Sequence, residues 1–309
     1  AYYFVVEDYV KANINAETMQ LPKSTDHSRL ILALTALGYD VTNVGGYNLL
    51  TALANYDYVI TDGIEGAALA LLALDSYDYE IPTKITGETQ TTNKNLGVYL
   101  REQKVASNGW NFEGKDAAAA DPAATGFVIQ ALSNYCNGFA AHEYNTHKAV
   151  DDALNAMIDV YYEDGELGSA EGNAQILSAH WSMVYRWENS SGSSYDVYGP
   201  TKFGFFDFDG NGDGDYLVDY ILDHYKADAA GFAHTKGGSY DQAATEQAFM
   251  ALITNIRGLA GLNYLFDMTD VTIAEENPIS DQKVADAVIA KIEAIGEVTL
   301  ESKAAIEEA

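Results

Sequence analysis

The sequence contains very little cysteine and proline, and both shortages narrow the range of folds. Cys136 is the sole cysteine among 309 residues, so no disulfide can form within the chain and a small disulfide-stapled fold is excluded. Only five prolines interrupt the chain, Ala-rich apolar segments dominate it, and the alternating β-branched residues typical of strands are scarce. This composition favours helices over sheets.

Basic residues are also scarce, with 17 lysines and arginines against 46 acidic residues and a net charge of −29. Such a surface repels phosphate backbones and anionic membranes, which argues against nucleic acid as a partner and favours cations. Apolar runs are short: the segment Ala67–Leu74 is far below the ~20 residues that cross a bilayer. The sequence therefore predicts no transmembrane segment.

Internal repeats indicate the architecture. The segments Asp121–Leu132 and Asp241–Leu252 share the pattern D-x-A-A-T-x-x-x-x-x-A-L and begin 120 residues apart (241 − 121). Each follows a glycine-aromatic pair, Gly109-Trp110 in the first case and Gly231-Phe232 in the second. Weaker copies occupy Ser28–Leu34, Gly66–Leu74 and Glu171–Trp181. The pattern predicts a repeated helix pair with loops of unequal length.

The repeats also predict where their helices begin. In the last copy, Ala244, Ala248, Leu252 and Ile256 recur every four residues, with Thr245, Phe249 and Ile253 beside them, and form a wide apolar helical stripe. The aspartate before each strong copy suits an N-cap, because its carboxylate accepts hydrogen bonds from the free N–H groups of the first turn. Asp121 and Asp241 are therefore predicted caps.

These units resemble repeats of the terpenoid cyclase and protein prenyltransferase superfamily, and more closely a bacterial surface-protein branch of it. The resemblance covers roughly residues 20–258. Its segments are Ala33–Gly38, Asn43–Leu50, Gly63–Gly66, Ala73–Ser76, Tyr79–Pro82 and Ala244–Gln247. It implies an all-α fold, an α/α toroid in which inner and outer rings of helices surround a cavity.

The predicted toroid covers residues 1–267, and the character of the sequence changes after it. Residues 268–280 look extended, Asp281–Ile295 is a charged amphipathic helix, and Glu301–Ala309 begins another. We interpret residues 268–309 as a linker and the start of a truncated helical module. The start at Ala1 rather than Met, without a recognisable signal segment, is interpreted as trimmed or recombinant.

Three chemistries of the resembled superfamily leave motifs that are missing from the sequence. The D-x-D-D acid of protonating lipid cyclases does not occur, and neither does the C-G-E-Q of thioester domains. Prenyltransferases hold zinc with an Asp, a Cys and a His. Tyr135-Cys136-Asn137-Gly138 has only a superficial likeness to the cysteine segment, and Cys136 fits a small core residue better.

An acidic segment predicts a calcium site. Calcium takes six to eight oxygen ligands in a curled loop, and acidic residues at alternate positions between glycines supply such oxygens. From the end of this segment, Asp215, Asp219 and Asp223 follow one another at intervals of four residues and would lie on one face of a helix. A shared cation would relieve the repulsion among their carboxylates. If Asp207 is position 1 of a helix-loop-helix calcium site, position 12 is Val218, where such sites usually have an acidic residue. The predicted ligands are Asp207, Asp209, Asn211, Asp213, Asp215 and Asp219. The alternative is a solvated acidic turn.

Three functions remain open. The first is a non-catalytic binding or scaffold module of an exported, modular bacterial surface protein, extracellular and calcium-stabilised, whose ligand is a glycan or a protein. The second is an enzyme that uses the toroid cavity on a polysaccharide or lipid through paired acids. Its candidate acids are Glu246, Asp241, Glu171 and Asp121. The third, implied by the cobalamin-binding branch, is a corrinoid carrier fragment, which would need a second domain.

Overall fold

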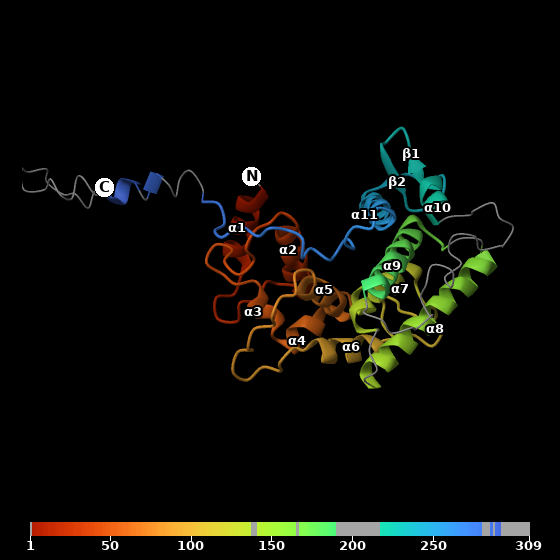
Figure 1. The fold of residues 1–309 in the computed structure, drawn as a ribbon, viewed down its shortest axis with the longest axis horizontal. Coiled ribbons are helices and arrows are strands. Elements are labelled where there is room, and N and C mark those ends of the chain that lie inside the picture. Colours follow the sequence, from red (N-terminus) through yellow and green to blue (C-terminus); the bar gives the residue numbers. More distant parts are fainter. Residues whose placement is uncertain are drawn as a thin grey trace, which may run out of the picture.

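The computed structural model describes residues 2–136, 141–164, 167–189, 217–279, 285–286 and 288–291 (Figure 1). Most of the described chain is helical. The helices are α1 (Tyr2–Asn13), α2 (Ser24–Ala36), α3 (Leu50–Leu53), α4 (Tyr56–Val59), η1 (Ile60–Asp62), α5 (Gly63–Asp75), α6 (Asn93–Glu102), α7 (Pro122–Leu132), η2 (Ser133–Tyr135), α8 (Ala141–Asp164), α9 (Ala170–Asn189), α10 (Leu217–Asp223) and α11 (Gln242–Leu259). The strands are β1 (Tyr225–Lys226), β2 (Gly231–Ala233) and β3 (Tyr240–Asp241).

Helices α2, α5, α7, α9 and α11 pack side by side in that order and form a curved row (Figure 1). Hydrogen bonds show that neighbours run in the same direction. Ser24 at the start of α2 donates to Asp62 just before α5, and Thr35 near the end of α2 bonds to Tyr79 just after α5. Because the row is parallel, equivalent positions of each helix face the same side.

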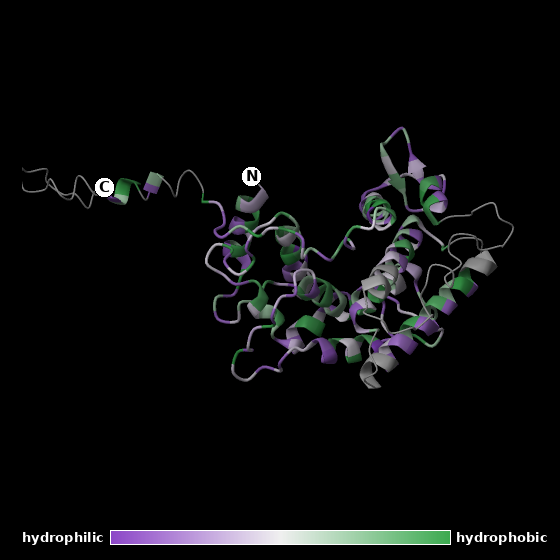
Figure 2. Ribbon diagram, in the orientation of Figure 1, coloured by the Kyte–Doolittle hydropathy of each residue, from purple (hydrophilic) through white to green (hydrophobic). Residues whose placement is uncertain are grey.

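The intervening helices cover the outer side of this row. Helix α6 packs on α5 and α8, α8 also packs on α7, and α10 packs on α9. Helix α5 lies at the centre of the core: every residue from Gly66 to Leu74 is buried. Figure 2 shows hydrophobic residues gathered along α5 and its neighbours. Among the helices that the structure describes, none is long and apolar enough to cross a membrane.

The repeat motif forms a hydrogen-bonded clamp at the start of its helix. Thr125 Oγ1 accepts from the backbone N–H of Trp110 at 3.0 Å and lies 3.2 Å from its carbonyl oxygen. Thr245 Oγ1 makes the same pair of contacts with Phe232, at 2.8 Å and 3.3 Å. Gly109 leaves room for this clamp, since a Cβ there would lie 2.9 Å from Thr125 Oγ1.

The predicted N-caps are confirmed. The Asp121 carboxylate accepts from the backbone N–H of Ala124 at 2.7 Å, and the Asp241 carboxylate accepts from Ala244 at 2.8 Å. Pro122 follows Asp121 as the first residue of α7, a position where its missing N–H costs no hydrogen bond. Local sequence therefore determines where these two helices begin.

The prediction of an all-α toroid is wrong. Strands β1, β2 and β3 form an antiparallel sheet in which Phe232 of β2 pairs with both Tyr225 and Asp241. In the described residues the helical row also ends at α11 without returning to α2, so the helices form an open arc and not a complete ring (Figure 1). The glycine-aromatic pair Gly231-Phe232 lies in the central strand, with backbone partners on both sides of it.

An irregular segment, residues 263–277, spans the arc from the end of α11 back to α2; we call it the strap (Figure 1). The N–H of Met268 donates to the Ser76 carbonyl at 2.7 Å, and the N–H of Ala274 donates to the Gly38 carbonyl at 2.8 Å. These carbonyls follow α5 and α2, so the strap runs across the carboxyl ends of the parallel helices. The predicted domain boundary at residues 267/268 falls within it.

Candidate binding groove

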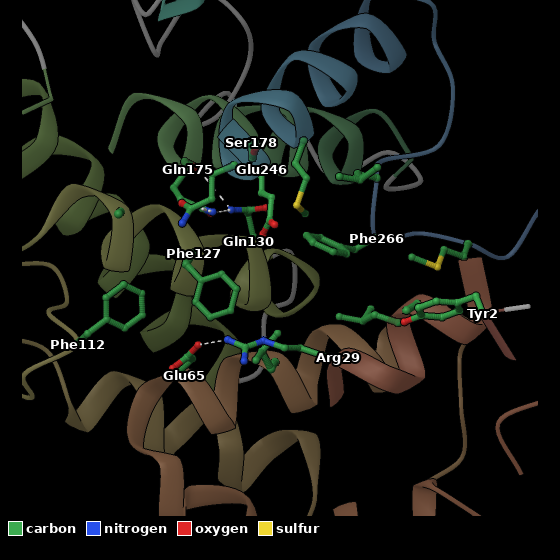
Figure 3. Close-up of a pocket in the computed structure, with 18 residues that line it drawn as sticks. Tyr2, Arg29, Glu65, Phe112, Phe127, Gln130, Gln175, Ser178, Glu246 and Phe266 are labelled. Carbon is green, nitrogen blue, oxygen red and sulfur yellow. Dashed lines mark hydrogen bonds and ion pairs between the residues drawn. The ribbon is translucent and has the colours of Figure 1, made fainter. Parts of the chain in front are cut away.

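The structure has a groove of about 670 Å³ on the side shared by the parallel helices (Figure 3). It is lined by side chains from α1, from all five helices of the row, from the loop before α7, and from the strap. The lining residues are Tyr2, Arg29, Leu32, Ala33, Glu65, Leu69, Phe112, Ala123, Phe127, Gln130, Gln175, Ser178, Glu246, Gln247, Met250, Leu265, Phe266 and Met268. The strap supplies the last three, so it forms part of the groove wall.

Phenylalanine and methionine make much of the groove apolar. Phe112 and Phe127 lie next to one another, with ring centroids 6.3 Å apart. Phe112 is 52% exposed and Met250 is 38% exposed, which is high for apolar side chains. Phe266 of the strap packs edge-on against Tyr264 and faces the groove (Figure 3). Exposed apolar surface in a concavity is typical of a binding site.

A chain of side-chain amides crosses the helical wall of the groove. Tyr264 hydroxyl donates to Gln130 Oε1, Gln130 Nε2 donates to Gln175 Oε1 at 2.6 Å, and Gln175 Nε2 donates to Gln247 Oε1 at 3.1 Å. We call these residues the glutamine ladder. Each bond fixes the orientation of the next amide, so the ladder ends with the Gln247 NH₂ group as a hydrogen-bond donor at the groove.

The charged side chains of the groove are Arg29, Glu65 and Glu246. The Arg29 guanidinium pairs with Glu65, and their side chains are 57% and 41% exposed, so the pair contributes little to stability. Glu246 Oε1 accepts from Gln242 Nε2 at 2.9 Å, and Glu246 is exposed. Figure 3 shows Glu65 and Glu246 on opposite sides of the groove.

The structure gives the four predicted acids different surroundings. Glu246 alone of the four lines the groove. Asp121 and Asp241 are N-caps, and Glu171 lies 2.9 Å from His234 Nδ1. Three of the four candidates thus have local structural partners away from the groove.

Sequence reasoning missed the glutamine ladder, although the repeats contain a sign of it. Gln247 lies six residues after the cap Asp241, and Gln175 lies six after Ser169, whose hydroxyl caps α9 through the Gly172 N–H (247 − 241 = 175 − 169 = 6). The same position after Asp121 is Phe127, which also lines the groove. Aligning the repeats on their caps would have identified this groove-facing position.

The calcium prediction falls mostly outside the described residues. The segment containing Asp207, Asp209, Asn211, Asp213 and Asp215 is not described, and Asp219 is exposed on α10. Within the described part of the chain, no group of three or more His, Cys, Asp or Glu side chains could hold a metal ion. The calcium site stays a prediction.

Cys136, His27 and His180 are buried. Burial raises the pKa of the Cys136 thiol, and its Sγ donates to the Leu132 carbonyl, so Cys136 is a core residue as predicted. Burial lowers the pKa of His27 to about 4, and its Nε2 accepts from the backbone N–H of Leu21. Burial also lowers the pKa of His180 to about 4. Both imidazoles are neutral at pH 7.

No protein-family model matches the chain, and no curated protein or solved structure matches it. The resemblance to the terpenoid cyclase and prenyltransferase repeats therefore stays a hypothesis that rests on the sequence motifs. Function is therefore inferred from the chemistry of the groove. That chemistry comprises an apolar surface, fixed amide groups and an exposed carboxylate, a combination suited to holding a ligand of mixed character.

Proposed function

We propose that this chain is a non-catalytic binding module that holds a ligand in the groove. The glutamine ladder carries this proposal. It ties α7, α9 and α11 together across the groove wall and presents a donor of fixed orientation in a groove that also exposes Phe112 and Met250. A site whose polar groups are held in place before binding loses less entropy when the ligand arrives.

On this proposal the module belongs to an exported bacterial surface protein and is stabilised by calcium. The net charge of −29 and the acidic segment before α10 support this view, together with the resemblance stated above. A strongly acidic surface keeps a protein soluble and disperses it by mutual repulsion, which suits an extracellular module.

A thermal-shift screen against glycans, peptides and lipids tests the proposal, followed by binding measurements on groove variants. We expect a ligand that raises the melting temperature of the native chain and binds about tenfold more weakly to Phe127→Ala or Gln247→Ala. Ile256→Ala is the matched control because Ile256 is 65% exposed on α11 and does not line the groove. A ligand whose binding is insensitive to the groove variants would contradict the proposal.

A second candidate function is a glycan-cleaving enzyme, favoured by Glu65 and Glu246 on opposite sides of the groove (Figure 3). Paired carboxylates that flank a sugar are the usual arrangement in glycoside hydrolysis. A panel of polysaccharides incubated with the native chain and with Glu246→Gln distinguishes the two functions. Product formation that is lost in the variant would establish the enzyme and overturn the binding module.

A further inference from the structure

We infer that the ligand of the groove is an extended peptide segment that combines apolar side chains with at least one basic side chain. This inference rests on the proposed function and specifies its ligand class. Three features of the groove carry it: the composition of its apolar surface, the donors that remain in that surface, and the sign of its charge.

The apolar surface fits hydrocarbon side chains better than sugars. Its rings come mainly from Phe112, Phe127 and Phe266, and Met250 and Met268 lie beside them. Phenylalanine has no polar group for the hydroxyls that cover a sugar and methionine sulfur is only a weak acceptor, whereas tyrosine and tryptophan combine an apolar ring with a polar group. Methionine is unbranched and adapts to different partner shapes. These residues favour the leucine- or phenylalanine-like side chains of a peptide.

Fixed polar groups within this surface argue against a purely hydrocarbon ligand. The NH₂ group of Gln247 ends the glutamine ladder, and Ser178 of α9, which is 5% exposed, also lines the groove. An acyl chain over these groups would deprive them of water without replacing its hydrogen bonds, at a cost in affinity. The carbonyl groups of a peptide backbone would accept from both donors.

The charge of the groove selects for a basic ligand. Its lining has one cation, Arg29, against two carboxylates, Glu65 and Glu246 (1 − 2 = −1), and Arg29 is already paired with Glu65. The exposed Glu246 therefore remains to pair with a ligand cation. The surrounding net charge of −29 attracts a basic segment and repels an acidic one.

The test measures the affinity of the full chain for four probes. Fluorescence anisotropy is used with labelled probes and calorimetry with unlabelled ones. The first probe is a ten-residue synthetic peptide that alternates lysine with leucine and phenylalanine. The second replaces each lysine with glutamate. The third is cellohexaose, and the fourth is palmitate. We expect the lysine peptide to bind at least about tenfold more tightly than each of the other three.

Variants then locate the binding. We expect Phe127→Ala and Met250→Ala to weaken the lysine peptide about tenfold, and Ile256→Ala on the exposed face of α11 to leave it unchanged. Glu246→Gln should weaken it at least about threefold more than Asp228→Asn, a matched removal of one exposed charge outside the groove. The melting temperature of each variant separates lost binding from lost folding, and Met250, which is 38% exposed, provides a variant that folds if Phe127→Ala does not.

Each contrary outcome has a distinct meaning. If cellohexaose or palmitate binds with dependence on Phe127 or Met250 while the peptides do not, the peptide inference is overturned and the binding module stands. If the two peptides bind equally, or if Glu246→Gln behaves as Asp228→Asn, the basic specificity is overturned. If no compound in these probes or in the wider screen binds with dependence on the groove variants, both proposals fall.

Discussion

The threonine clamp is the residue-scale feature that most directly connects the repeats to the fold. Thr125 is fully buried, and its single hydroxyl serves both the N–H and the carbonyl of Trp110, which is itself fully buried. No water can replace the hydroxyl without a cavity in the core. The clamp therefore explains why the threonine and the glycine-aromatic pair occur together in both strong copies of the repeat.

Replacing Thr125 with valine tests the clamp. The substitution keeps the shape of the side chain but removes the hydroxyl, so we expect the free energy of unfolding to fall by about 1–3 kcal/mol. Urea denaturation followed by circular dichroism measures the change. Thr125→Ser retains the hydroxyl, so its free energy of unfolding should fall less than that of Thr125→Val. Equal stability of the valine variant and the native chain would show that the clamp contributes nothing to stability.

His27 makes stability depend on pH in a defined direction. Its folded pKa of about 4 lies below the ordinary 6.5, because burial disfavours the charged imidazole. The unfolded chain therefore binds a proton near pH 6.5 that the folded chain accepts only near pH 4. This contribution to stability is complete above pH 6.5 and is lost as the pH falls to 4; it amounts to on the order of 3 kcal/mol.

Comparison with His27→Gln isolates this effect from the titration of other groups. Glutamine can accept from the Leu21 N–H but does not titrate. As the pH falls from 7 to 4.5, the free energy of unfolding of the native chain should therefore fall relative to that of His27→Gln. Denaturant melts at closely spaced pH values provide the measurement. A difference that is constant with pH would show that His27 is protonated alike in both states.

At the scale of the element, the caps of α7 and α11 separate a structural role from a functional one. We expect Asp121→Ala and Asp241→Ala each to lower the free energy of unfolding by about 1 kcal/mol, because each leaves a first-turn N–H without its partner. Affinity for a groove ligand should not change in either variant. Loss of binding or turnover without loss of stability would instead indicate that these aspartates act on a ligand.

The acidic segment before α10 gives a second prediction about an element. If Asp207, Asp209, Asn211, Asp213, Asp215 and Asp219 bind calcium, millimolar calcium should raise the free energy of unfolding by on the order of 1–3 kcal/mol. Magnesium should stabilise the chain less than calcium does, and Asp209→Asn should abolish the stabilisation by calcium. Thermal melts in calcium and in chelator test this; identical melting temperatures would refute the calcium site.

At the scale of the whole molecule, the charge of −29 should oppose the compact state. We expect the melting temperature to rise by a few degrees, on the order of 1 kcal/mol, between 10 mM and 500 mM sodium chloride, since salt screens the repulsion among carboxylates. Calorimetry at constant pH measures it, and choline chloride serves as the control for specific sodium binding. A melting temperature that falls with salt would mean that attractive ion pairs dominate.

Much of the local structure is determined by sequence alone. Asp121 caps α7 through an amide three residues away, Ala244 and Ala248 in the predicted stripe of α11 are buried although Ile256 in it is 65% exposed, and the buried Cys136 follows from the apolar stripe that leads to it. These features involve neighbouring residues, whose distance in space is set by helix geometry. For the same reason the absence of a long apolar run predicted that no described helix spans a membrane.

Only the tertiary structure decided that the helices form an open arc with a groove. The Gln175–Gln247 and Arg29–Glu65 contacts join residues 72 and 36 positions apart, and Asn277 bonds to Asp40 across 237 residues. No periodicity in the sequence relates such pairs. Strands of two or three residues are also too short to show an alternating pattern, so the sheet was missed. Short-range geometry therefore determined where the helices begin, whereas the packing of distant segments determined the groove and what it can hold.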